Sequence, residues 1–165
     1  MATELHDIIV PTLTRGLATL SALLEKGAAH AGNDAAALLD ARLIEDMHPL
    51  VRQVQMVSDS AKGAMARLGQ VDNPSMPDTE TSFAELQGRI ARTLDFVRSV
   101  PASAVNGREE EVIVLKFPIG EFRVTAIDFV RNFALPNFYF HLTTSYALMR
   151  ANGVPLGKMD FLGGM

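Results

Sequence analysis

Apolar residues recur every three or four positions over most of this chain, the spacing that places side chains on one face of an α-helix. The first such stretch covers about residues 3–29 and contains Pro11, which is expected to kink the helix or mark its first turn. The second begins near Asp46, a candidate N-cap, and ends at Gly69. The core-facing residues predicted for these two helices are Leu5, Ile8, Ile9, Leu13, Leu17, Leu20, Leu24, Leu50, Val54, Val57, Ala61, Met65 and Leu68.

Turn-forming residues separate the second helix from a third. Residues 70–81 contain Asn-Pro and Met-Pro-Asp sequences, which are typical of a surface loop. Ser82 and Glu85 follow with the spacing of a capping box, in which each residue bonds to the backbone amide of the other. A third long helix is therefore predicted from Ser82 to about residue 99.

After residue 110 the pattern changes to short β-branched and aromatic runs, 111–117 and 121–124, separated by Pro-Ile-Gly, which predicts a β-hairpin. A short helix is predicted over 125–133 and a long one over 137–151, with Pro136 interrupting or kinking the chain between them. Together these elements predict an all-α fold, an antiparallel four-helix bundle with crossover connections and a small hairpin insert before the last helices. Residues 1–165 are expected to form a single domain.

Composition and charge limit the expected cellular location of the protein and the classes of partner that it binds. The 165 residues carry a net charge of -4 and no cysteine, which excludes disulfides and thiolate chemistry. An acidic chain without a basic patch argues against nucleic-acid binding. No signal peptide or membrane-spanning run is recognised, so we expect a cytoplasmic protein with no membrane partner. The positive mean hydropathy of +0.14 favours a homodimer that covers residual apolar faces.

The last predicted helix carries the candidate chemistry, because it combines His141 with several other polar side chains. A polar group buried without a partner costs roughly 1–3 kcal/mol, so these groups must be hydrogen-bonded or bind a ligand. The residues expected to bind a small molecule are Asn137, Tyr139, Thr144 and Tyr146. The competing interpretation is structural: a core histidine bonded to a neighbour, and tyrosine rings in the core.

Several motifs together resemble an uncharacterised family of the DinB/YfiT-like bundle superfamily. They are Asp-Met-His-Pro-Leu at 46–50, Pro-Asn-Phe-Tyr-Phe-His at 136–141 and the tail Asn-Gly-Val-Pro-Leu-Gly-Lys-Met-Asp at 152–160. The resemblance implies this bundle fold over nearly the whole chain. Characterised members of the superfamily bind a metal, and several are S-transferases that use bacillithiol, mycothiol or a similar low-molecular-weight thiol.

The metal pattern implied by this resemblance takes one histidine from the second helix and two, four residues apart, from the last. His48 and His141 match two of these positions, and the ion expected there is Zn, Ni or Fe. Asn137 and Ser145 stand four residues from His141 where the third histidine would be, so the third ligand is open. Asp46, Asp128 and Glu45 are the carboxylates that could complete the set.

Three kinds of function follow from these observations. The first is a divalent-metal-dependent enzyme of the thiol S-transferase type, with its site around His141 and the start of the second helix. The second is a non-catalytic bundle protein that binds a small molecule or thiol and has lost the metal triad. The third is a structural homodimer. Whether the protein is an enzyme is left open by the sequence.

Overall fold

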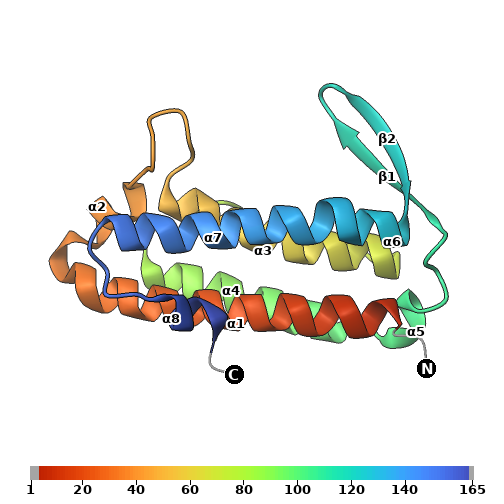
Figure 1. Ribbon diagram of the computed structural model, residues 1–165, viewed down its shortest axis with the longest axis horizontal. Helices are drawn as coiled ribbons and strands as arrows, with labels where there is room; N and C mark the ends of the chain where they lie inside the picture. The colour runs from red at the N-terminus through yellow and green to blue at the C-terminus, as the bar shows by residue number, and fades with distance from the viewer. Residues whose placement is uncertain (1–3, 164–165) are drawn as a thin grey trace.

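The computed structural model describes residues 4–163 and consists mainly of helices, with one hairpin that projects from them (Figure 1). The long helices are α1 (Leu5–Ala31), α3 (Leu50–Gly69), α4 (Phe83–Ser99) and α7 (Leu135–Ala151). The hairpin consists of β1 (Val112–Phe117) and β2 (Gly120–Thr125). The short segments are η1 (Gly32–Asp34), α2 (Ala35–Asp40), α5 (Ala102–Val105), α6 (Ala126–Phe129), η2 (Val130–Ala134) and α8 (Lys158–Leu162). The expectation of a mostly helical protein with a small hairpin is confirmed.

Each long helix packs mainly against two of the others: α1 contacts α4 and α7, and α3 contacts the same two. Figure 1 shows α1 and α7 running in one direction and α3 and α4 in the other. Antiparallel neighbours are therefore α1 with α4 and α3 with α7, whereas α3 with α4 and α1 with α7 are parallel neighbours. A parallel pair requires a long connection, and residues 70–82 provide it between α3 and α4. They run back along α3, because Asn73 contacts Lys62 in its second half and Asp78 contacts Arg52 in its first turn.

The apolar stripes predicted for the first two long helices form the core, and of the thirteen residues named for them only Ile8 is not fully buried. Burying one such leucine contributes about 1.5–3 kcal/mol. The stretch Leu5–Asp40 is long and apolar enough to cross a membrane by length and composition alone, a test that core helices also pass. In this structure Leu13, Leu17 and Leu20 of that stretch are completely buried against the other helices.

The predicted N-cap of the second long helix was wrong by three residues. Asp46 is not its N-cap, because α3 begins at Leu50 and Pro49 occupies the N-cap with an extended backbone. A residue that precedes a proline is disfavoured in the helical region, and His48 accordingly lies before α3. The chain enters α3 through a hydrogen bond of 3.0 Å from the Leu50 amide to the Ala41 carbonyl. The predicted end at Gly69 is confirmed.

Half of the predicted capping box is present at the start of α4. The Ser82 hydroxyl accepts a hydrogen bond of 3.2 Å from the Glu85 amide, as expected. The Glu85 carboxylate accepts from the Thr81 amide at 2.7 Å rather than from that of Ser82. These hydrogen bonds lower the pKa of the Glu85 carboxyl, the Thr81 amide being the largest cause.

Pro136 does not break the last helical segment. Residues 126–151 run continuously through α6, η2 and α7, and η2 is a π-helical turn in which the Leu135 amide donates to the Val130 carbonyl five residues back. In an α-helix the proline ring would clash with the carbonyl of Asn132, four residues earlier. The wider turn just before Pro136 removes that clash and places one extra residue on the face of the helix.

Candidate functional site

A cavity of about 200 Å³ lies between α3 and the segment formed by the end of α6, η2 and the start of α7. Its lining combines apolar and polar side chains from both segments: Met56, Asp59, Ser60, Ala64, Arg67, Phe129, Phe133, Ala134, Asn137 and His141. Asn137 and His141 reach the same cavity because residues four apart in a helix lie on one face. Two of the predicted site residues are thus brought together.

His141 has a defined tautomer, because a chain of hydrogen bonds leads from its ring to the start of α3. The side-chain amide nitrogen Nε2 of Gln53 donates to the His48 carbonyl at 3.2 Å, which turns the Gln53 Oε1 toward His141. That oxygen lies 2.8 Å from the His141 Nδ1, and an amide oxygen can only accept, so Nδ1 carries the proton. In the neutral ring the lone pair is then on Nε2, which can accept a hydrogen bond from a ligand.

The His141 ring is held in its neutral form. Burial is the largest cause, because it disfavours the charged imidazolium and lowers the pKa of His141 below its usual value of 6.5. The nearby positive charges of His48 and Arg52 lower the pKa of His141 further. His141 is therefore suited to accepting a proton or a hydrogen bond at neutral pH rather than to holding an anion by its own charge.

This lowered pKa predicts a pH-dependent stability. In the unfolded chain His141 takes up a proton below about pH 6.5, whereas in the folded protein it does so only at lower pH. The stability due to neutral His141 is thus fully present above pH 6.5 and is lost as pH falls through the lower folded pKa. We expect the drop in Tm between about pH 7.5 and about pH 5.5 to be smaller in His141→Gln than in the wild type. Equal drops measured by thermal denaturation would contradict this assignment.

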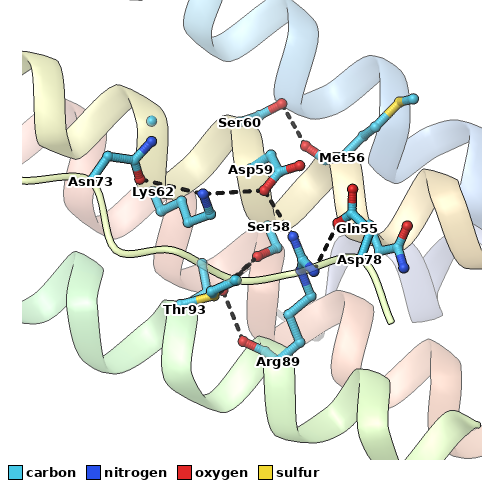
Figure 2. Close-up of polar contacts among 12 residues, drawn as sticks. Gln55, Met56, Ser58, Asp59, Ser60, Lys62, Asn73, Asp78, Arg89 and Thr93 are labelled. Carbon is cyan, nitrogen blue, oxygen red and sulfur yellow. Dashed lines mark hydrogen bonds and ion pairs between the residues drawn. The ribbon is translucent and has the colours of Figure 1, made fainter. Parts of the chain in front are cut away.

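Asn137 is fixed against the opposite wall of the cavity. Its Nδ2 donates to the Ser60 hydroxyl at 2.7 Å. That hydroxyl donates to the Met56 carbonyl one turn earlier in α3 at 2.7 Å, a contact that Figure 2 shows. The remaining acceptor of Asn137 is its Oδ1, which has no protein partner among residues 4–163. Asn137 therefore ties α7 to α3 and leaves one polar atom for a ligand.

The other three residues predicted to bind a substrate lie elsewhere on α7. Tyr139 lines a different depression, beside Gly16 and Leu142, and its side chain is exposed. Thr144 donates to the Phe140 carbonyl of its own helix at 2.7 Å. Tyr146 packs edge-on against Phe161, with ring centroids 5.7 Å apart. The structure does not bring these residues to the cavity of Asn137 and His141.

The metal set implied by the resemblance is incomplete in the folded protein. His48 is near enough for its charge to affect the pKa of His141, so the two predicted ligands belong to one region. Within residues 4–163, however, no three His, Asp or Glu side chains are grouped so that they could hold a metal ion. The Ser145 hydroxyl, one candidate for the third position, donates to the His141 carbonyl at 2.8 Å. The residues present therefore do not fit a three-ligand metal site.

Behind the cavity lies a charged cluster that the sequence analysis missed. Arg89 of α4 is completely buried, and its guanidinium contacts Asp59 of α3 at 2.8 Å and Asp78 at 3.0 Å (Figure 2). It also contacts Glu80 at 3.2 Å. Asp59 also contacts Lys62 at 3.3 Å. Figure 2 shows Arg89 on one side of α3 and Ser60 on the other, so the cluster supports the α3 wall of the cavity from behind.

The fold defines the class of this protein as DinB-like. The crystal structure of a DinB family member protein from Shewanella denitrificans is similar to it, with a TM-score of 0.89 and 36% sequence identity over 98% of this chain and 93% of that chain. A family model described as a domain of unknown function, DUF1993, matches residues 5–162, and the chain belongs to that family. No curated protein matches the chain. The resemblance to an uncharacterised DinB-like family is thus confirmed.

Proposed function

We propose that this protein is a DinB-like four-helix bundle that binds a small organic molecule in the cavity between α3 and α7 without performing chemistry on it. The observation that carries this proposal is the mixed lining of the cavity. Its polar groups, His141 and Asn137, are fixed by hydrogen bonds to protein atoms, yet each keeps one acceptor available. Ligand sites are typically apolar pockets with a few oriented polar groups of this kind.

The rigidity of the lining supports binding rather than a purely structural role. Gln53 orients the His141 ring, and Ser60 orients the Asn137 amide, so the polar groups do not have to be ordered when a ligand arrives. Two aromatic rings, Phe129 and Phe133, provide the apolar part of the lining. A closed network without a cavity would have favoured the structural interpretation of His141.

The proposal is tested with a neutral aromatic probe, phenylacetamide, added to isotope-labelled protein and followed by NMR. We expect saturable shifts of the backbone amides near Asn137 and His141. In Ala64→Leu the added side chain occupies the cavity, because Ala64 is a buried part of its lining, and we expect binding to weaken roughly tenfold or more. Ala91→Leu, on the exposed face of α4, is the matched control and should bind as the wild type does.

Two results would contradict the proposal. One is the absence of any saturable shift with the wild-type protein. The other is unchanged binding in Ala64→Leu, which would place the probe outside the cavity; a thermal melt of each variant verifies that it is folded.

The divalent-metal-dependent thiol S-transferase is our second candidate, favoured by the nearness of His48 to His141. Two imidazoles would need a further ligand, so we derive no reaction step through a metal. Elemental analysis of untagged protein and of His141→Ala decides between the candidates: one equivalent of Zn, Ni or Fe that disappears in the variant would favour the enzyme. A homodimer also stays a prediction, and the exposed apolar side chains of Ile119 and Phe122 on the hairpin favour it.

A further inference from the structure

The guanidinium of Arg67 is placed at the cavity by the absence of a side chain at Gly63. Arg67 folds back along α3, and its Nη1 donates to the Gly63 carbonyl at 2.9 Å. A Cβ atom at residue 63 would lie only 2.8 Å from that nitrogen, so any other residue would displace the guanidinium. Because the side chain folds back by four residues, the guanidinium lies about one helical turn, about 5.4 Å along the axis of α3, closer to Ser60 than the Arg67 backbone does.

This charge is not neutralised by the protein. Among residues 4–163 no carboxylate is paired with Arg67, and its one hydrogen bond is the bond to Gly63. Asp59 is the only carboxylate of the cavity lining, and it is already compensated by Arg89 at 2.8 Å and Lys62 at 3.3 Å. Arg67 is therefore a cation of the cavity lining that has no carboxylate partner among residues 4–163.

The apolar wall beside this charge is aromatic. The rings of Phe129 and Phe133 stack with centroids 5.9 Å apart and an interplanar angle of 24°. Phe133 also contacts Phe117 of the hairpin, with centroids 5.6 Å apart, which holds its ring in place. A pair of fixed rings favours a flat apolar group that can pack against them face-on or edge-on.

Resting on the function proposed above, we propose that the ligand of this cavity is a small aromatic monocarboxylate, its carboxylate on Arg67 and its ring against Phe129 and Phe133. A guanidinium binds a carboxylate through two parallel hydrogen bonds, and Arg67 has its Nη2 and Nε donors available for this. A single cation matches a single negative charge, whereas a doubly charged phosphate would remain partly uncompensated. The volume of about 200 Å³ limits the body of the ligand to about one ring with a short substituent.

The test compares phenylacetate with its neutral isostere phenylacetamide by NMR titration of the full chain. We expect phenylacetate to bind roughly tenfold more tightly than phenylacetamide, and acetate, which lacks the ring, to bind more weakly than either. In Arg67→Met the preference should disappear, because the affinity for phenylacetate falls to about that for phenylacetamide. Arg131→Met removes an exposed cation of η2 that does not line the cavity and should leave both affinities unchanged.

The outcomes separate this inference from the function on which it rests. Equal affinities for the two aromatic probes, or an unchanged preference in Arg67→Met, would overturn the carboxylate assignment and leave the binding function standing. Binding of acetate as tight as that of phenylacetate would overturn the aromatic part. If neither aromatic probe binds, both proposals are wrong. Arg67→Lys, which keeps the charge but not the paired hydrogen bonds, should show an intermediate preference.

Discussion

Replacing Arg89 by methionine should destabilise the protein by about 3–5 kcal/mol, the effect expected when one partner of a buried ionic cluster is removed. Arg89 is the charge shared by Asp59, Asp78 and Glu80, and the Glu80 side chain is only 6% exposed. Without the guanidinium, the buried Glu80 carboxylate would face those of Asp59 and Asp78, which are 37% and 39% exposed, between α3, α4 and residues 70–82. Since small domains have a total stability of about 5–15 kcal/mol, this loss is a large fraction of it.

The measurement is urea denaturation of the wild type, Arg89→Met and Arg92→Met. Arg92 belongs to the same helix and is 4.0 Å from Glu80, but its side chain is 60% exposed, so it should contribute no more than about 1 kcal/mol. A loss below about 1 kcal/mol in Arg89→Met would show that the carboxylates are compensated without Arg89, by Arg52, which pairs with Asp78, and by Lys62, which contacts Asp59. Such a result would mean that the contacts of Arg89 with Asp78 and Glu80 do not hold residues 70–82 against α4.

The long helices were predictable from sequence because each is stabilised by an apolar stripe on one face. Such a stripe appears in the sequence as apolar residues that recur every three or four positions. The Arg89 cluster has no such signature. Its members belong to α3, α4 and the segment between them, and each is a charged residue of a kind that normally faces solvent. They are brought together by the parallel packing of α3 and α4. The spacing of apolar residues predicts each helix but not how two helices pack.

The candidate site was predictable only in part, for a geometric reason. Asn137 and His141 are four residues apart and share a face of α7, so the cavity between α3 and α7 could be located from them. Tyr139 is two residues from His141, about 200° around the helix, which explains why it points to a different depression. Arg67 was missed because its position depends on the hydrogen bond to Gly63, a contact that no spacing rule indicates.

Replacing Gly16 by alanine should destabilise the protein by about 1–3 kcal/mol, although alanine is the better helix former. A Cβ atom at residue 16 would lie 2.4 Å from Cε1 of Phe138 and 2.7 Å from its Cζ, far inside normal contact distance. The Phe138 ring is completely buried and has no space to move into. The substitution must therefore push α1 and α7 apart.

Gly88→Ala is the matched control, because Gly88 also lies inside a long helix. Its Cβ would have only the flexible end of Arg92 nearby, at 3.5 Å, so alanine should stabilise α4 by up to about 1 kcal/mol. Urea denaturation of both variants separates close packing from helix propensity, since propensity favours alanine equally at both positions. Gly16→Ala should also weaken probe binding, because Phe138 is adjacent to Asn137 and its displacement shifts the amide that contacts Ser60. Two stabilised variants would mean that α1 and α7 are not in close contact at Gly16.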